Sequence, residues 1–188
     1  MFWLKKTASA EALDVAMSGV KLGDRLLVLG CGDPTLVAQL ALKTGLTGRA
    51  CALDEDAAQT ARAARVVERE GALVEMLTSP WTQLPLESEG FDVVVIRDAL
   101  PRIELHQRAA LVGEVLRVLR PGGRCVVIEG GGRGGLGALF QGRTANAEYA
   151  SSGGASRALS AGGFRAVREL AHRGGLTFVE GVKAVASA

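Results

Sequence analysis

The stretch Arg25–Pro34, RLLVLGCGDP, decides the fold. Its first half, Arg25–Leu29, is a short apolar run without polar alternation, which is typical of a strand buried on both faces of a parallel sheet. Gly30 and Gly32 follow directly, and apolar residues at helical spacing begin after Pro34. A buried strand, a glycine turn and a helix in succession indicate the first unit of an α/β domain.

The same alternation continues along the chain. Further strand candidates, separated by helical patterns, are Gly48–Leu53, Ala72–Leu77, Phe91–Ile96 and Arg124–Glu129. Two closing strand-like runs, Phe164–Ala171 and Leu176–Ala186, are joined by Arg173-Gly174-Gly175, which predicts a β-hairpin. We therefore predict an α/β fold: a doubly wound, mostly parallel seven-stranded sheet with helices on both faces and an antiparallel last strand.

Length and composition fit one domain over residues 1–188. With 48% hydrophobic and 22% charged residues, the chain is neither a disordered protein nor a coiled coil. A net charge of +2 gives no reason to expect a nucleic-acid partner. No run approaches the ~20 apolar residues of a membrane span, and the first residues lack the order of a signal peptide, so we expect a cytoplasmic protein.

The cysteines and the glycines carry different information. Cys31, Cys51 and Cys125 show no C-x-x-C spacing, so we interpret them as small buried residues and expect no metal site. The segment 130–154 is rich in glycine and lacks periodicity, which predicts a mobile loop. It is either a lid over an acceptor pocket or a surface excursion without a role. The side chains that would close such a lid are Leu136, Leu139, Phe140 and Tyr149, with Arg133 and Arg143 for an anionic group.

Ligands of open α/β sheets bind at the carboxyl ends of the strands. The glycine loop ends the first predicted strand, and Asp54 ends the second. A glycine loop lets a ligand approach the backbone, and a carboxylate offers acceptors for the two hydroxyls of a ribose, so the pair predicts a nucleoside ligand. A dinucleotide fingerprint would need glycine at position 35, where this chain has Thr35.

Three further segments carry a family resemblance. They are LRVLRPGGR at 116–124 running into CVVI at 125–128, Leu84-Pro85 followed by FDVVV at 91–95, and Gly162-Gly163-Phe164. With the glycine loop, they make residues 20 to 185 resemble the class I S-adenosylmethionine-dependent methyltransferases, nearest to the small quinone-biosynthesis type. The resemblance implies a Rossmann-like methyltransferase fold, S-adenosylmethionine as cofactor and a small-molecule acceptor.

The resemblance also implies a set of cofactor-binding residues: Gly30, Cys31, Gly32, Asp54, Trp81, Arg97 and Asp98. The glycine loop would contact the methionine part, and Asp54 would hold the ribose hydroxyls. Trp81 would lie beside the adenine, or else pack in the core. Arg97 and Asp98 would line the cofactor and acceptor side.

The chain departs from the family pattern at three places. Val28 stands where the family has an acid two positions before the first glycine, and Pro34 replaces the third glycine. Asp33 and Asp98 are the candidates to compensate for the missing acid. Many relatives carry a histidine where this chain has residues 100–102, LPR, and the sequence identifies no catalytic base. Two functions therefore stay open, an active methyltransferase and a catalytically silent methyltransferase-like binding or partner protein, with a dehydrogenase as a more distant third.

Overall fold

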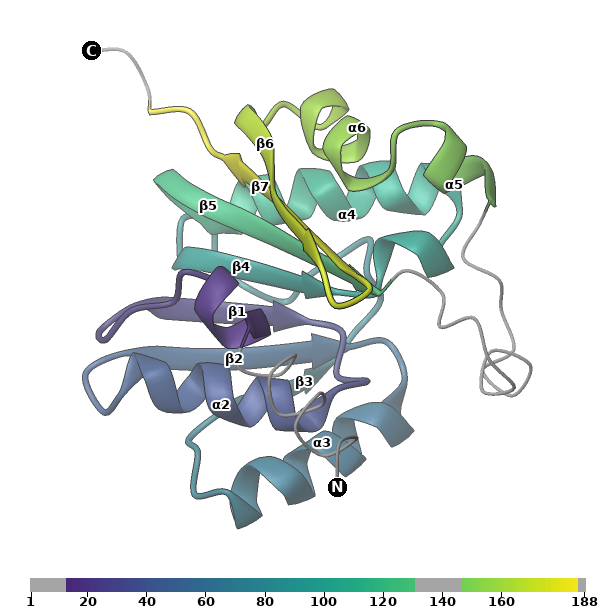
Figure 1. The fold of residues 1–188 in the computed structure, drawn as a ribbon. Helices are drawn as coiled ribbons and strands as arrows, with labels where there is room; N and C mark the ends of the chain where they lie inside the picture. Colours follow the sequence, from purple (N-terminus) through teal and green to yellow (C-terminus); the bar gives the residue numbers. More distant parts are fainter. Residues whose placement is uncertain (1–12, 131–146, 186–188) are drawn as a thin grey trace.

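The computed structural model describes residues 13–130 and 147–185, which form one seven-stranded sheet in the order β3-β2-β1-β4-β5-β7-β6 (Figure 1). The strands are β1 (Arg25–Leu29), β2 (Arg49–Asp54), β3 (Glu75–Thr78), β4 (Phe91–Arg97), β5 (Leu119–Gly130), β6 (Arg165–Arg173) and β7 (Leu176–Val182). The helices are α2 (Pro34–Thr44), α3 (Ala57–Arg69), α4 (Leu105–Val118), α5 (Ala147–Ser151) and α6 (Gly154–Ala161), with a short 3-10 helix, η1 (Leu100–Arg102).

The strand directions confirm the predicted topology. The five strands β1 to β5 pair in parallel, whereas β7 lies between β5 and β6 and runs antiparallel to both. The predicted hairpin turn is present, and Gly174 and Gly175 have φ angles of 64° and 78°. Two consecutive positive φ angles are what a tight hairpin turn requires, and glycine adopts them without steric cost.

Strand β3 is shorter than the predicted run Ala72–Leu77. The end of helix α3 uses the first part of that run, because the Ala72 amide donates to the Val67 carbonyl at 3.0 Å. Gly71, with φ at 70°, makes the reversal that this contact requires.

Helices cover both faces of the sheet, as predicted (Figure 1). Helices α2 and α3 bury one face, and α4, α5 and α6 bury the other, so the core divides into two clusters. Alternate residues of β1 supply both clusters: Leu26 and Val28 face α2, whereas Leu27 and Leu29 face α4. Strands buried on both faces explain the unbroken apolar runs in the sequence.

The structure corrects the irregular loop predicted over 130–154. Residues 147–151 form α5, and Tyr149 is only 4% exposed because its ring packs beneath the Arg108 guanidinium, 4.4 Å from the ring centroid. Tyr149 is therefore a core residue and not part of an open lid. The remaining lid residues at 133–143 lie outside the described part of the chain, so the lid stays a prediction.

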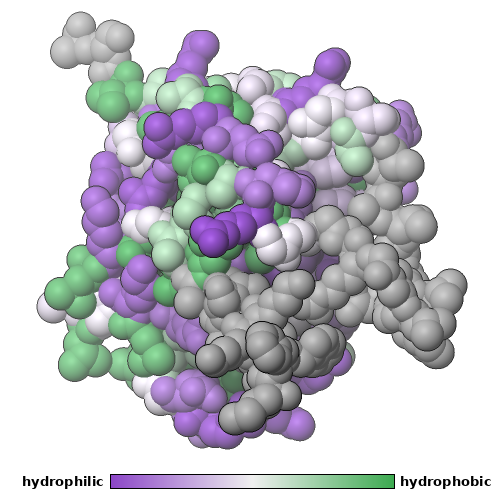
Figure 2. Space-filling view, viewed as in Figure 1, coloured by the Kyte–Doolittle hydropathy of each residue, from purple (hydrophilic) through white to green (hydrophobic). Residues whose placement is uncertain are grey.

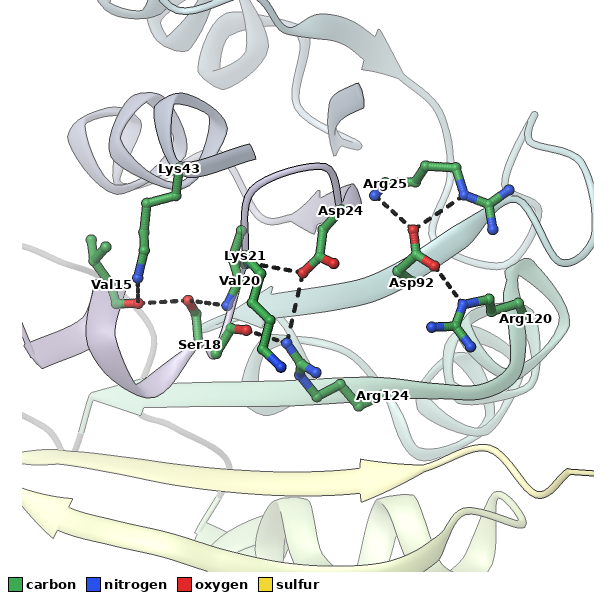
Figure 3. A network of polar contacts seen from close by, with 11 residues as sticks. Val15, Ser18, Val20, Lys21, Asp24, Arg25, Lys43, Asp92, Arg120 and Arg124 are labelled. Atoms are coloured by element: carbon green, nitrogen blue, oxygen red, sulfur yellow. Dashed lines mark hydrogen bonds and ion pairs between the residues drawn. The ribbon is translucent and has the colours of Figure 1, made fainter. Parts of the chain in front are cut away.

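A polar network closes the amino-terminal edge of the sheet (Figure 3). At the start of β4, one oxygen of Asp92 accepts hydrogen bonds from the amide and Nε of Arg25 at 2.8 and 3.2 Å, and the other accepts from Arg120. In β5, Arg124 donates to the Gly19 carbonyl. These groups satisfy one another, so this edge is structural.

The visible surface mixes hydrophilic and hydrophobic side chains (Figure 2). The large apolar residues that stay exposed include Leu22, Leu42 and Leu46. Among the described residues, no helix has both the length and the apolar character needed to cross a bilayer.

Candidate functional site

The glycine loop lies at the carboxyl end of β1, pressed between its two neighbouring strands. Gly30 has a φ of 100°, and a Cβ at this position would lie 2.3 Å from the backbone oxygen of Arg97 at the end of β4. The Gly30 amide donates to the Leu53 carbonyl of β2 at 3.0 Å. Only glycine fits here, for reasons of both conformation and space.

Asp54 fixes this loop through its carboxylate. Its Oδ2 accepts from the Cys31 amide at 2.7 Å and its Oδ1 from the Asp56 amide at 3.0 Å. The side chain is 8% exposed, so it is buried against both loops. Each oxygen keeps a further lone pair for a ligand hydroxyl. Asp54 therefore has a structural role that the sequence did not reveal, in addition to its predicted role in binding a ligand.

The start of α2 presents an open backbone surface. Asp33 is the N-cap and accepts from the Leu36 amide at 3.1 Å, and Pro34 takes the first helical position. The amide that proline lacks has no helical partner there, so this departure from the family pattern leaves the helix intact. Among the described residues, a Cβ added to Gly32 would meet only the Arg102 side chain, at 4.0 Å. The loop is thus closed at Gly30 and accessible at Gly32.

Arg97 brings a buried positive charge to the same edge. Its guanidinium lies 3.3 Å from Asp98, 3.9 Å from Asp14 and 4.0 Å from Asp33. Its side chain is 13% exposed, and within the described residues its Nε and Nη1 make no hydrogen bond. The guanidinium thus lies among three carboxylates, and its Nη1, though without a hydrogen bond among the described residues, is within ion-pair distance of Asp98.

Asp98 connects β4 to β5 at this edge. It has a positive φ of 50°, and its Oδ1 accepts from the Gly130 amide at 2.7 Å. Its own amide donates to the Ile128 carbonyl at 3.1 Å. Asp98 thus holds the carboxyl ends of the two strands together.

These residues fit S-adenosylmethionine. The amino-acid end of this cofactor carries one carboxylate and one ammonium, and the site offers both the Arg97 guanidinium and the carboxylates of Asp33 and Asp98. Val28 stands in β1 where the family has an acid. It is 1% exposed and lies in the core, so β1 itself offers no carboxylate to the cofactor. The acceptors of Asp54 suit the ribose hydroxyls.

Trp81 lies inside the protein. It is 6% exposed and belongs to the core cluster on the α4 face, together with Leu84. Trp81 therefore packs in the core, as one of the two interpretations of the sequence predicted. Its contact with an adenine stays a prediction.

Sequence reasoning missed two residues at the same edge, Glu129 and Arg108, and assigned a third, Tyr149, to a lid. Glu129, near the end of β5, accepts a hydrogen bond from the Tyr149 hydroxyl at 2.6 Å. Arg108, in the first turns of α4, is 6% exposed and donates to the carbonyls of Leu100 and Ile103 at 3.0 and 2.8 Å. Arg108 falls four residues before the buried Val112, and a charged residue on a helix's buried stripe was the available signal.

Glu129 has an unusual proton affinity. Burial raises the pKa of its carboxyl to about 7, against the hydrogen bond from Tyr149, which lowers it. The charge of Asp98 adds to the rise and that of Arg108 opposes it. Burial also raises the pKa of Tyr149, so its hydroxyl remains a donor.

A surface depression elsewhere has no comparable chemistry. It lies beside α4, near the starts of β4 and β5, and is lined by residues 83–87, Glu114 and Arg117. Arg117 donates to the Leu84 and Leu86 carbonyls and to Glu114, so its polar groups are paired. The described ranges also contain no cluster of three or more His, Cys, Asp or Glu side chains that could hold a metal ion.

Comparison with known proteins agrees with this geometry. A family model described as "Methyltransferase domain" matches residues 26–123. The ubiquinone/menaquinone biosynthesis C-methyltransferase UbiE of Pseudomonas putida is 32% identical over 117 residues, which cover 61% of this chain and 45% of that protein. The chloroplastic 2-phytyl-1,4-beta-naphthoquinone methyltransferase of Arabidopsis thaliana is also 32% identical, with the same coverage. The chain thus spans about half the length of these curated relatives.

The fold matches solved structures over a longer range than the sequence does. A SAM-dependent methyltransferase from Aquifex aeolicus superposes with a TM-score of 0.75, covering 93% of this chain and 89% of that one at 19% identity. This likeness shows the fold. The family model covers more than half of the chain and includes the glycine loop, Asp54 and the segment through β4 and α4. The chain therefore belongs to the methyltransferase domain family, within the class I S-adenosylmethionine-dependent methyltransferases.

Proposed function

We propose that this chain transfers a methyl group from S-adenosylmethionine to a small-molecule acceptor. The observation that carries the proposal is the joined cradle of the glycine loop and Asp54, whose carboxylate bonds the Cys31 amide beside an accessible Gly32. When bound, the cofactor supplies a methyl group on a positively charged sulfur.

The protein residues divide the work of binding. Asp54 holds the ribose hydroxyls, and Arg97 pairs with the carboxylate of the amino-acid end. Asp33 and Asp98 bond backbone amides through Oδ1 and face the Arg97 guanidinium through Oδ2, and the remaining lone pairs of these oxygens accept from the ammonium. Methyl transfer depends largely on holding the acceptor in line with the methyl group, so a rigid cradle is the main requirement.

The acceptor that we infer is the ring of a reduced quinone. The names of the relatives, a quinone-biosynthesis C-methyltransferase and a naphthoquinone methyltransferase, support this class. A reduced quinone carries aromatic hydroxyls, and losing a hydroxyl proton makes its ring carbons nucleophilic. Such an acceptor would use a base near the methyl group.

The alternative of a silent binding protein rested on Val28, on Pro34 in the glycine loop and on the absent histidines. Pro34 and Asp33 together form a regular start to α2, so the alteration leaves a loop of ordinary structure. The structure gives the silent alternative no specific support.

Calorimetric titration with S-adenosylmethionine and with adenosine tests the cofactor site. Asp54→Asn should weaken both ligands by about 10- to 150-fold, the range for a lost hydrogen bond to a charged group. Glu55→Gln, at the exposed neighbouring position, should leave both affinities unchanged. Because Asp54 also holds two loops, thermal unfolding of each variant must show that the domain is intact.

Arg97→Gln separates the two ends of the cofactor. Loss of the guanidinium should weaken S-adenosylmethionine by at least about tenfold, because a charge-assisted contact to the carboxylate is lost. Adenosine lacks that carboxylate, so its affinity should stay the same. A wild-type protein that binds neither ligand, or an Arg97→Gln variant that loses both equally, would contradict the proposed site.

A further inference from the structure

Glu129 lies on the same edge of the sheet as the glycine loop. A short series of contacts connects them: Gly30 packs against the Arg97 backbone oxygen, Asp98 follows Arg97, and Asp98 binds the Gly130 amide at 2.7 Å. Glu129 precedes Gly130 and, by strand alternation, shares the α4 face with Val127. The Glu129 carboxylate is therefore beside the cofactor cradle, but it belongs to β5, the strand that follows β4 in the sheet order.

Tyr149 binds this carboxylate directly, and Arg108 supports Tyr149. Tyr149 of α5 donates to Glu129 Oε1 at 2.6 Å. Arg108 of α4 stacks over the Tyr149 ring and is itself fixed by the Leu100 and Ile103 carbonyls. Within the described residues, no hydrogen bond to Oε2 is present, so one oxygen is anchored and the other is available.

Several elements pack against Glu129. Tyr149 from α5, Arg108 from α4 and Asp98 from the end of β4 act on its charge. Thr177 of β7 pairs opposite Glu129, and His172 of β6 bonds to the Thr177 hydroxyl at 2.8 Å. The charges of Asp98 and Arg108 act in opposite directions, and burial is the largest influence on the proton affinity of the carboxyl. A carboxylate that holds its proton near neutral pH is suited to general base chemistry.

We propose that Glu129 is the catalytic base that takes the hydroxyl proton of an aromatic acceptor, with Tyr149 and Arg108 as positioning residues. This inference rests on the proposed function, methyl transfer to the ring of a reduced quinone. It assigns the proton acceptor that neither the sequence nor the family resemblance identified.

In the proposed reaction, the O–H bond of the acceptor breaks and its proton forms a bond to Glu129 Oε2. The ring becomes electron-rich and forms a bond to the methyl carbon, while the carbon–sulfur bond breaks and its electron pair stays on sulfur. The ring carbon then loses its own hydrogen as a proton to water, which restores the aromatic ring and leaves a phenolate oxygen. Glu129 returns the first proton to this oxygen, which restores both the hydroxyl and the carboxylate.

The choice of an aromatic hydroxyl follows from the strength of the base. A carboxylate with a pKa of about 7 can take a proton from a phenol as the methyl bond forms, because the two proton affinities are within a few units. An aliphatic alcohol is too weak an acid for this base. A neutral amine needs no base before it attacks.

The first test requires no turnover. The probe is 2-naphthol, whose protonated and ionised forms differ in fluorescence, added to the protein with S-adenosylhomocysteine. Excited 2-naphthol is a strong acid, so wild type should bind it and give naphtholate emission wherever Glu129 is ionised and can accept the proton, with an inflection near pH 7. Glu129→Gln should bind the probe and leave it protonated, and Glu169→Gln, at an exposed position of β6, should behave like wild type.

The second test follows methyl transfer to a 2-alkyl-1,4-naphthoquinone reduced with dithionite. Glu129→Gln should lower kcat by about 10²- to 10⁴-fold and abolish its pH dependence near 7. Tyr149→Phe should keep most activity but move the inflection to higher pH, because the lost hydrogen bond had lowered the Glu129 pKa. A residue with only a structural role would change stability and not this inflection.

The outcomes separate the two proposals. If wild type methylates the quinol and Glu129→Gln, shown to be folded by thermal unfolding, keeps the same rate and pH profile, the inference is overturned and the proposed function stands. If wild type binds the cofactor and ionises 2-naphthol through Glu129 but methylates no quinol, the quinol acceptor is wrong and Glu129 remains the base. If 2-naphthol does not bind, or ionises equally in Glu129→Gln, the inference is overturned.

Discussion

Asp92 shows what a single carboxylate contributes at the edge opposite the site. Burial raises the pKa of Asp92, but the hydrogen bonds from Arg120 and from the backbone and side chain of Arg25 outweigh it and lower the pKa to about 2. These contacts bring together the starts of β1 and β4 and the beginning of β5. The ionised form of Asp92 is thus bound more tightly in the folded protein than in the unfolded chain.

This lowered pKa makes stability depend on pH. A depressed folded pKa adds stability that is complete above the unfolded value of 3.8 and is lost as pH falls through about 2. The difference corresponds to about 2 kcal/mol, so Asp92→Asn should lower the free energy of unfolding by that amount at pH 7. Urea unfolding at pH 7 and at pH 2.5 measures it.

The control for this prediction is Glu68→Gln, at an exposed position of α3. It should leave the unfolding free energy within about 0.5 kcal/mol of wild type at both pH values. An Asp92→Asn deficit that is as large at pH 2.5 as at pH 7 would contradict the ion-pair explanation.

The residues of the site differ in how readily the sequence predicts them. Gly30 and Asp54 follow apolar runs at a recognisable spacing, because backbone turns and strand ends constrain residue type locally. The contact between Glu129 and Tyr149 joins residues 20 positions apart across a segment without periodicity. No local rule predicts it, because the contact exists only once α5 docks on the sheet.

Helix α4 shows the limit of periodicity at the scale of one element. The sequence pattern favours a stripe through Leu105, Ala109, Val112, Leu116 and Leu119. The helix instead buries Arg108, Leu111, Val112, Val115 and Val118, and Leu105 is 72% exposed. Both stripes are apolar at helical spacing, and docking against β4, β5 and α6 selects between them. The pattern therefore predicted the helix correctly but rotated its buried face. It also extended the helix to Leu119, which instead begins β5.

Two glycines of different elements should respond oppositely to alanine. Gly174 in the β6–β7 turn has positive φ with open space around it, so Gly174→Ala should destabilise the protein by about 1–2 kcal/mol through backbone strain alone. Gly113, exposed in the middle of α4, also has open space but ordinary φ, so Gly113→Ala should stabilise it by about 0.5–1 kcal/mol.

Thermal or urea unfolding of the two variants beside wild type measures both effects. Equal signs would show that the turn or the helix differs from the structure. Neither added methyl group meets another atom of residues 13–130 or 147–185 within 4 Å, so a steric clash with this part of the chain explains neither effect.

At the scale of the whole molecule, the strand order follows from turn chemistry and strand type. Five buried apolar runs separated by helical patterns predicted the parallel part, and Gly174-Gly175 predicted the antiparallel hairpin. The sequence did not predict α5, because a five-residue helix has too few positions to show a period and gains its stability from tertiary contacts. Global topology was therefore easier to predict than the packing around residues 147–154.

The labelling rates of the three cysteines can measure how readily different parts of the molecule unfold. Burial raises the pKa of Cys31 and Cys51 to about 12 and also raises that of Cys125. A disulfide reagent at pH 8 should therefore label the thiols of the native protein slowly. In guanidinium chloride, the same reagent should label all three thiols at once. Cys31 should be labelled faster than Cys125, because the glycine loop can open locally whereas the centre of β5 opens only with the sheet.

Mass spectrometry of digested samples assigns each label to its cysteine, and the denatured protein supplies the intrinsic rates. Cys125 labelled as fast as Cys31 would show that β5 opens as readily as the loop and would contradict the expected order.

The position of β7 between β5 and β6 has a consequence for synthesis on the ribosome. Strand β6 emerges first, yet among the described strands its only partner is β7, which also completes the free side of β5. Until β7 leaves the exit tunnel, the nascent domain presents an unpaired β5 with the apolar side chains of Cys125, Val127 and Ile128. The nascent chain therefore passes through an aggregation-prone stage before β7 pairs, in which a chaperone would protect it from neighbouring nascent chains on the same polysome.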